Sequence, residues 1–301
     1  HRRLNQSRSN GKNGRPVSSI LELLQQAQSA LKKQHPDTAN FEAKTLLKHC
    51  LNIQSSDLVT ALNDPIHDTE KLQQFEHCLA RRLNNEPLDL IIGNTVFRGN
   101  DYEVQKAVLL PRPETEILVE HVHSKIQALT LENPTIIELG FGTGVISIEL
   151  AKAYPEATLH AWDISENAFK LAQRNKAMHA VNNLHLYHDD FFSSSAAWRK
   201  LESPFVFVSN PPYIPSEDIK GLDCAVTDYD PITALDGGPS GLDFYKRCFA
   251  ELKGKCHFQA YELGIDQFKA LNEEASNEGY RYECFADYHD IPRILILQDL
   301  Y

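Results

Sequence analysis

The sequence predicts an α/β protein whose larger part is a doubly wound parallel sheet, preceded by a small helical domain and a β-hairpin linker. Two patterns predict this fold class. From residue 110 onward, short apolar runs of strand length alternate with amphipathic runs of helix length, as in a parallel sheet covered by helices. Before residue 85, the periodic stretches have helical spacing. We therefore divide the chain into a helical domain (17–84), a linker (85–109) and an α/β domain (110–301).

Composition limits the class of protein. The chain has 301 residues, 42% of them apolar, which suits one or two globular domains. Its 30 basic and 41 acidic residues leave a formal net charge of −11, unlike the basic surface of a nucleic-acid-binding protein. No run approaches the ~20 consecutive apolar residues that a membrane helix needs. The net charge leaves room only for a local basic patch, so we expect no direct nucleic-acid binding and no membrane insertion.

The six cysteines are scattered along the chain, at positions 50, 78, 224, 248, 256 and 284. None forms a C-x-x-C pair and no Cys/His spacing is typical of zinc, so we predict no metal site. We expect reduced thiols in the bacterial cytoplasm, with an organelle as the open alternative. Residues 1–16 contain no acid and no apolar signal core. They are predicted to be a disordered tail, with a cloning remnant or the end of a transit peptide as alternatives.

Three helices are predicted in the helical domain. Ser18 or Ser19 can cap the first, with Glu22 in its first turn. Its apolar residues recur at helical spacing: Ile20, Leu23, Leu24, Ala27 and Leu31. The second spans residues 41–52, and the third begins after Asp68. Because about 70 residues bury only a small core, we expect this domain to pack on something else.

The linker region has a different character from its neighbours. In residues 85–109, short runs rich in β-formers are separated by Gly93-Asn94 and by Arg98-Gly99-Asn100, which are turn sequences. This pattern predicts a β-hairpin between the two domains.

A glycine-rich turn follows the first strand of the α/β domain, between that strand and a helix. Glycines allow a tight turn and the close approach of a ligand. The turn consists of Gly140, Phe141, Gly142, Thr143 and Gly144. The pattern alone is compatible with NAD, FAD or S-adenosyl-L-methionine. Its third glycine lies one residue earlier than in the dinucleotide fingerprint. A shorter loop suits S-adenosyl-L-methionine, which has no pyrophosphate, and Glu138 suits its positive sulfonium and amino groups.

The next two strands end in further candidate cofactor ligands. Asp163 ends the second strand and is predicted to accept hydrogen bonds from both ribose hydroxyls. The third strand ends at Asp189-Asp190-Phe191, where an adenine would lie. One acid would accept a hydrogen bond from the adenine amino group, and Phe191 would stack on its ring.

The fourth strand ends abruptly in Asn210-Pro211-Pro212-Tyr213. The prolines remove two N–H donors and fix φ, so the carbonyls before them lack ladder partners. The amide oxygen of Asn210 and a main-chain carbonyl would then accept both hydrogens of a planar NH₂ group, with the Tyr213 ring packed on its face. We predict Asn210 as the catalytic residue and the whole turn, with Pro211, Pro212 and Tyr213, as the substrate site.

This turn resembles the motif of amide and exocyclic-amine methyltransferases that use S-adenosyl-L-methionine. Three further runs are similar to the PrmC/HemK family, the glutamine methyltransferases of peptide chain release factors: residues 108–116, 230–242 and 287–293. The resemblance covers residues 86–301, and the helical domain also fits it. The strongest parts are the Pro111-Arg112-Pro113-Glu114-Thr115-Glu116 entry and the Leu235-Asp236-Gly237-Gly238 segment.

The resemblance implies a Rossmann-like class I methyltransferase domain with a seven-stranded sheet ending in an antiparallel hairpin. It also implies methyl transfer from S-adenosyl-L-methionine, leaving S-adenosyl-L-homocysteine. The acceptor would be the side-chain amide nitrogen of the glutamine in the Gly-Gly-Gln motif of class I release factors. The helical domain would recognise that factor. Asn210 and the Pro211 carbonyl would hold the glutamine amide.

Three alternatives stay open at this point. They are a sister enzyme that methylates a ribosomal-protein glutamine, an adenine-N6 methyltransferase of DNA or RNA, and a non-catalytic protein that keeps the fold. The 235–238 segment favours the release-factor enzyme, and the net charge counts against the nucleic-acid enzyme. Four residues depart from the family's usual pattern: Asp89, Glu138, Phe141 and Phe191. Of these, Phe141 is the one expected to crowd the cofactor pocket.

Overall fold

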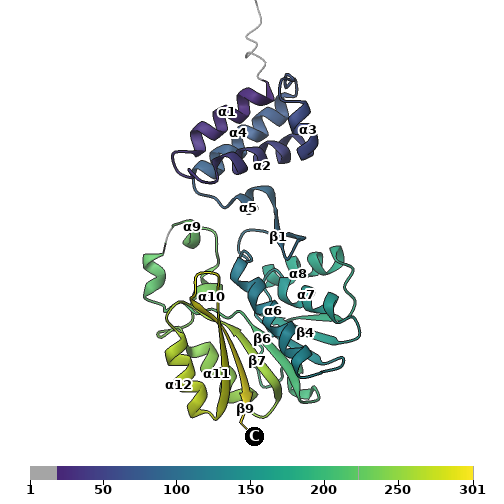
Figure 1. Ribbon diagram of the computed structural model, residues 1–301, viewed down its shortest axis with the longest axis vertical. Helices are drawn as coiled ribbons and strands as arrows, with labels where there is room; N and C mark the ends of the chain where they lie inside the picture. The colour runs from purple at the N-terminus through teal and green to yellow at the C-terminus, as the bar shows by residue number, and fades with distance from the viewer. Residues whose placement is uncertain (1–18, 223, 301) are drawn as a thin grey trace, which may run out of the picture. The chain divides into compact units, whose positions relative to one another are not determined.

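The computed structural model describes residues 19–222 and 224–300, and it divides the chain between Ile92 and Gly93 into two units (Figure 1). The predicted disordered tail (1–16) and the alternative cap Ser18 lie outside the described residues. Among the described residues, no helix combines the length and apolar character that a membrane span requires.

The first unit is helical. Its helices are α1 (Ile20–Leu31), α2 (Ala39–Leu51), α3 (Ser55–Thr60), α4 (Thr69–Leu83) and α5 (Leu88–Ile92). All five apolar residues predicted for the inner face of α1 are buried. Ser19 is the cap: its hydroxyl accepts from the Glu22 N–H at 3.2 Å, while its own N–H donates to the Glu22 carboxylate at 3.0 Å. The short α3 and α5 were not predicted, because five or six residues show too little periodicity.

The second unit begins with a hairpin of β1 (Asn94–Phe97) and β2 (Asn100–Glu103). The unit boundary therefore falls inside the predicted linker. The α5 residue Ile91 is buried in the core of the helical unit, whereas the hairpin lies in the second unit.

A seven-stranded sheet follows, in the order β5-β4-β3-β6-β7-β9-β8. Its strands are β3 (Thr135–Leu139), β4 (Thr158–Asp163), β5 (Leu184–His188), β6 (Phe205–Ser209), β7 (Cys256–Glu262), β8 (Tyr280–Ala286) and β9 (Pro292–Asp299). The first five strands in this order, from β5 to β7, run parallel to one another. The strand β9 pairs antiparallel with both β7 and β8. The predicted parallel sheet with a terminal antiparallel hairpin is confirmed.

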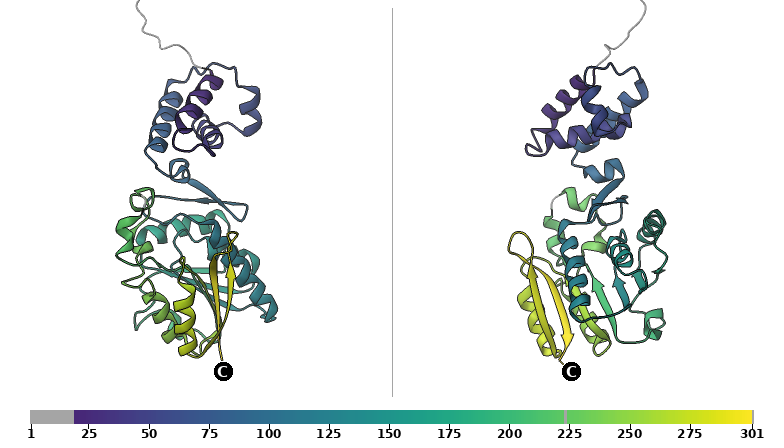
Figure 2. Two further views of the ribbon diagram at one scale, coloured as in Figure 1. Left: turned by 60° about the vertical axis from the view of Figure 1, so that its left-hand side comes forward. Right: turned by 45° about the vertical axis from the view of Figure 1, so that its right-hand side comes forward.

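Helices cover both faces of this sheet (Figure 2). One face packs on α6 (Pro113–Ala128), α7 (Val145–Ala153) and α8 (Glu166–Met178). The other packs on α11 (Asp243–Leu252), α12 (Phe268–Asn277) and the 3-10 turn η1 (Ala197–Lys200). The connection from β6 to α11 carries η2 (Asp218–Gly221), α9 (Cys224–Thr227) and α10 (Ile232–Leu235). Strands covered on both faces need apolar side chains throughout, which is why β6 is buried at all five positions.

One buried side chain connects the hairpin to the rest of the second unit. The Asn175 amide on α8 accepts from the Glu103 N–H at 2.8 Å and donates to the Glu103 and Thr143 carbonyls, both at 3.0 Å. Asn175 is fully buried. It therefore joins β2, α8 and the glycine-rich turn through three hydrogen bonds.

Asn175→Ala should lower the free energy of unfolding of the second unit by about 2 kcal/mol, because it leaves the buried Thr143 carbonyl and two half-buried main-chain groups of Glu103 without this partner. Both tryptophans lie in this unit, so urea denaturation followed by tryptophan fluorescence reports it. Asn167→Ala, exposed on the same helix, is the control and should change the free energy by less than ~0.5 kcal/mol. Equal effects of the two substitutions would contradict the anchoring role.

Candidate active site

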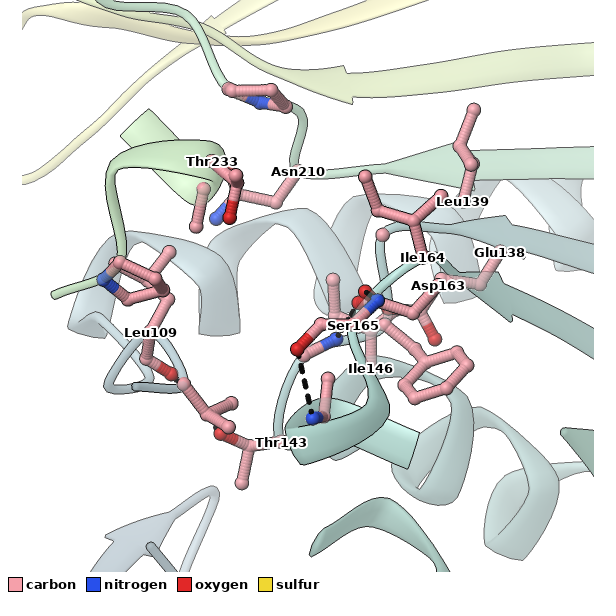
Figure 3. Close-up of a pocket in the computed structure, with 18 of the residues that line it drawn as sticks. Leu109, Glu138, Leu139, Thr143, Ile146, Asp163, Ile164, Ser165, Asn210 and Thr233 are labelled. Carbon is pink, nitrogen blue, oxygen red and sulfur yellow. Dashed lines mark hydrogen bonds between the residues drawn. The ribbon is translucent and has the colours of Figure 1, made fainter. Parts of the chain in front are cut away.

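A cavity lies at the carboxyl edge of the sheet, within the second unit. It is lined by segments that follow β3, β4, β5 and β6, and by parts of 107–112 and 231–234. Asn210 stands on one side of it and Asp163 on another (Figure 3). The predicted site residues that line it are Gly140, Phe141, Gly142, Thr143, Asp163, Phe191, Asn210 and Pro212. The structure thus brings together residues that lie up to 72 positions apart in the sequence.

The glycine-rich turn is held in a conformation that only glycine adopts readily. Gly140 and Gly142 have φ values of 76° and 50°. The Thr143 hydroxyl donates to the Leu109 carbonyl at 3.1 Å, which ties the turn to the neighbouring wall. Gly144 is not a lining residue. A Cβ atom on it would lie 3.1 Å from that of Ala172, so this glycine lets α7 pack closely on α8.

Asp163 receives two main-chain hydrogen bonds. Its Oδ2 accepts from the Gly142 N–H at 2.9 Å and its Oδ1 from the Ser165 N–H at 2.8 Å. Burial raises the pKa of this carboxyl, and the two N–H donors oppose that rise. Each carboxylate oxygen has room for a second hydrogen bond. The carboxylate can therefore still accept two hydroxyl groups from a ligand in the cavity.

Glu138 is a buried carboxylate with one oxygen free. Its Oε2 accepts hydrogen bonds from the N–H and the hydroxyl of Ser147, while Oε1 is buried without a partner. Burial, with a smaller contribution from the charge of Asp163, raises the pKa of Glu138 to about 7. Glu138 is among the residues that line the cavity, so its carboxylate would attract a cationic group bound there.

Two aromatic residues of the cavity wall belong largely to the core. Phe141 and Phe191 are 3% and 1% exposed. Phe191 stacks on Trp198 with a centroid distance of 4.7 Å, so that face of its ring is covered. The stacking of an adenine on Phe191 stays a prediction, and it would have to use a part of the ring that Trp198 does not cover. Ile164, 66% exposed and lining the cavity, offers an apolar surface that the sequence analysis missed. The sequence could have indicated Ile164, because it directly follows the predicted ribose ligand Asp163.

Asn210 directly follows β6 and is held from two sides. The Ser209 hydroxyl donates to the Leu139 carbonyl at 2.7 Å, which fastens the end of β6 to β3. The Asn210 Nδ2 donates to the Thr115 Oγ1 at 3.3 Å. A Cβ atom on Gly140 would lie 3.8 Å from the Asn210 carbonyl oxygen, so the glycine turn and the Asn210 turn are neighbours.

The rest of the Asn-Pro-Pro-Tyr turn is braced from outside the cavity. Pro211 and Tyr213 are not lining residues. The Tyr213 ring packs against the core, and burial raises the pKa of its hydroxyl to about 12. Its carbonyl accepts from the Gln267 Nε2 at 2.7 Å, and the same nitrogen donates to the Gly241 carbonyl at 3.1 Å. Sequence reasoning missed Gln267, which lies 54 residues away and carries no local signal.

An ion pair joins two walls of the cavity. The Arg112 Nη2 lies 2.6 Å from the Asp230 Oδ2, linking the segment before α6 to the segment before α10. Burial raises the pKa of Asp230, and the Arg112 charge opposes this. The sequence analysis singled out both segments only as stretches of family resemblance. The structure shows that they meet through opposite charges.

Comparison with known proteins agrees with this architecture. A family model described as the PrmC N-terminal domain matches residues 22–93, and the methyltransferase small domain matches residues 113–221. A release factor glutamine methyltransferase of Thermodesulfovibrio yellowstonii is 32% identical, over 85% of this chain and 91% of that protein. The chain belongs to the release factor glutamine methyltransferase family. Enzymes of the same name from Geobacter sulfurreducens (31% identical; 93% of this chain, 96% of that protein) and Bacillus cereus (34%; 82% and 87%) are also similar.

Solved structures support the fold of this family member. The METTL16 catalytic domain in complex with a MAT2A 3′UTR hairpin has a TM-score of 0.55 at 15% identity, covering 89% of this chain and 94% of that one. The N-terminal domain of human METTL16 in complex with SAH has a TM-score of 0.50 at 16% identity, covering 90% and 96%. At such identities the likeness concerns the fold alone. The predicted methyltransferase fold class is confirmed.

Glu138→Gln should stabilise the ligand-free protein more at pH 8 than at pH 5. The folded-state pKa of about 7 lies above the ordinary value of 4.5, so the folded state binds more protons between these values. The free energy of unfolding of the wild type therefore falls as pH rises through this window. The uncharged variant lacks this loss, which is on the order of 2 kcal/mol. Melting temperatures at both pH values measure it.

The control for this experiment is Glu156→Gln, which changes an exposed glutamate and should behave alike at both pH values. Any packing effect of the amide at position 138 is the same at both pH values and cancels in the comparison. A Glu138→Gln stability difference that is independent of pH would show that this carboxyl titrates normally.

Gly237→Ala should destabilise the protein through the Asn-Pro-Pro-Tyr turn. A Cβ atom at position 237 would lie 2.8 Å from both the Pro212 carbonyl oxygen and the Tyr213 Cα, so backbone must move. Overpacking of this kind costs about 1–3 kcal/mol, measurable by thermal or urea unfolding. Gly221→Ala is the matched control, since its added methyl group meets open space. A Gly237→Ala protein as stable as this control would refute the close packing.

Proposed function

We propose that this protein transfers a methyl group from S-adenosyl-L-methionine to the side-chain amide nitrogen of the glutamine in the Gly-Gly-Gln motif of class I peptide chain release factors. The observation that carries the proposal is a single cavity. It joins the glycine turn, the buried Glu138 and the half-buried Asp163 to the Asn210 turn, in a chain that belongs to the release factor glutamine methyltransferase family. Cofactor and acceptor sites therefore share one space.

The residues at one side of the cavity fit S-adenosyl-L-methionine. Asp163 has a free acceptor site on each carboxylate oxygen for the two ribose hydroxyls. The unpartnered Oε1 of Glu138 suits the positively charged amino group. Ile164 presents an apolar surface for the adenine. When bound, the sulfonium would supply an electrophilic methyl group. The Gly140 and Gly142 backbones leave space for close approach of the ligand.

The chain's part in the reaction is to orient a weak nucleophile. The nitrogen of a glutamine amide shares its lone pair with the carbonyl group. If the Asn210 Oδ1 and a main-chain carbonyl of the same turn accept its two hydrogens, its lone pair is directed at the methyl group. Orientation of this kind is worth several kcal/mol. The half-buried Tyr213 packs against the core beside this turn and helps to fix its backbone.

We assign recognition of the intact factor to the helical unit, as the family match over residues 22–93 supports. Its exposed apolar side chains Phe41 and Val59, 65% and 70% accessible, are suited to contact with another protein. The bacterial relatives support action in the bacterial cytoplasm. The acidic net charge of −11 favours a protein acceptor over DNA or RNA.

The proposed function is tested with labelled S-adenosyl-L-methionine and four acceptors: a class I release factor, the same factor with its Gly-Gly-Gln glutamine replaced, a ribosomal protein mixture, and DNA or RNA. Label should enter only the intact factor, and mass spectrometry should place one methyl group on that glutamine. Transfer to ribosomal protein or to nucleic acid alone would assign the enzyme to one of the alternative classes. No transfer to any acceptor would refute the proposal.

Asn210→Ala should lower kcat at least ~10²-fold, because a positioned hydrogen bond to the reacting group commonly carries ~10²–10³ in rate. Cofactor affinity, measured by calorimetric titration, should change much less. Asn182→Ala, at an exposed position, is the control and should leave kcat unchanged. Melting temperatures of all variants identify structural damage. A folded, cofactor-binding Asn210→Ala enzyme with near-normal kcat would rule out this mechanism.

A further inference from the structure

A buried hydrogen-bond chain continues from Asn210 into the protein, and the mechanism above does not use it. The Asn210 Nδ2 donates to the Thr115 Oγ1 at 3.3 Å, and this hydroxyl donates to the Glu262 Oε2 at 2.7 Å. Thr115 lies in the first turn of α6, and Glu262 ends β7. They are 3% and 2% exposed. Three elements far apart in the sequence therefore meet through polar side chains.

The hydrogens of this chain define its direction. A threonine hydroxyl has one hydrogen, and here Glu262 accepts it. The oxygen of Thr115 can then only accept from Asn210, so the NH₂ end of the Asn210 amide must face Thr115. Asn210 also acts as a hydrogen-bond donor that lowers the pKa of Glu262. With its NH₂ end engaged by Thr115, the amide turns its oxygen the other way, and Asn210 lines the cavity.

That direction decides what the site can bind. The two ends of an asparagine amide have nearly the same shape but opposite hydrogen-bonding character. With oxygen toward the cavity, Asn210 accepts a hydrogen from an incoming NH₂ group. Rotated by 180°, it would present its own NH₂ group to that NH₂ group, and two donors would face each other.

We propose that Thr115 and Glu262 are positioning residues that hold the Asn210 amide with its oxygen toward the cavity, so that the site selects an acceptor with a planar NH₂ group. The proposal deepens the proposed function and rests on it for the identity of the acceptor. The direction of the amide itself does not depend on that identity.

Hydrogen bonds from neighbouring elements fix the position of Glu262. The Tyr245 hydroxyl on α11 donates to its carbonyl oxygen at 2.7 Å. Arg293 on β9 donates to the adjacent Leu263 carbonyl at 3.2 Å, and its charge favours the ionised carboxylate. Burial and the charge of Glu114 act in the opposite direction, and the net result raises the pKa of Glu262 to about 7. In this structure Oε2 of Glu262 accepts from Thr115, and the ionised form of the carboxyl can only accept, which is consistent with this direction of the chain.

The test compares Thr115→Val, which keeps the shape but removes the hydroxyl, with Thr115→Ser, which restores it. We expect Thr115→Val to lower kcat at least ~10-fold, with the cofactor KM changed by less than ~2-fold, because misdirection of a reacting-group contact affects turnover. Thr115→Ser should recover most of the rate. Glu262→Gln should also lower kcat, since a carboxamide can donate as well as accept.

The second readout does not depend on methyl transfer. In protein carrying ¹⁵N-asparagine, the Asn210 side-chain NH₂ signal, assigned from its absence in Asn210→Ala, should exchange slowly with solvent in the wild type. Exchange should become at least ~10-fold faster in Thr115→Val and stay slow in Thr115→Ser. This measurement decides the direction of the amide even if the release factor is not the acceptor.

Two results would overturn the proposal. One is a folded Thr115→Val enzyme with wild-type kcat and unchanged NH₂ exchange. The other is a Thr115→Ser enzyme as slow as Thr115→Val, which would make the methyl group rather than the hydroxyl responsible. A wild-type enzyme that transfers no methyl group to the release factor would refute the proposed function, while slow NH₂ exchange that depends on the Thr115 hydroxyl would still support the positioning role.

Discussion

The parallel register of β3 with both of its neighbours is the constraint on which the site depends. Leu139, the last residue of β3, pairs with Trp162 of β4 on one side and with Ser209 of β6 on the other. The chain therefore leaves the sheet beside Asp163 and Asn210 at the same level. A one-residue slip of either pairing would turn the side chains at these strand ends to the opposite face of the sheet. Side-chain periodicity and backbone hydrogen bonding thus set the geometry before any ligand is present.

Two buried carboxylates, those of Glu138 and Glu262, lower the stability of the ligand-free protein. One carboxylate oxygen of Glu138 accepts two hydrogen bonds from Ser147, and the other has no partner. Glu262 accepts a hydrogen bond from Thr115, which contacts Asn210. Burial raises the pKa of each to about 7. Above that pH, both destabilise the ligand-free protein, because a charged group is held away from water. Polar groups that are buried at a cost in stability are typical of sites where dipoles and charges are already oriented before the substrate binds.

The walls of the cavity are joined by contacts between distant parts of the chain. Asn175 links the hairpin to the glycine turn, Gln267 braces the Tyr213 carbonyl, and Arg112 pairs with Asp230. Each contact meets a main-chain group or a charge that would otherwise be buried without a partner. The same contacts couple the stability of the site to that of the fold, so substitutions in this layer are expected to affect both.

The sequence by itself determined the alternation of strands and helices, a serine cap at residue 18 or 19, the glycine turn after β3 and the position of Asp163 and Asn210 at strand ends. These features depend on neighbouring residues, through periodicity, capping and φ preferences. Only the tertiary structure decided that Phe191 stacks on Trp198 and that Thr115 and Glu262 stand behind Asn210. Thr115 lies 95 residues from Asn210, and a partner so distant leaves no periodic trace in a sequence. Trp198 is close to Phe191 in the sequence, but their contact likewise depends on how whole elements pack rather than on local backbone preference.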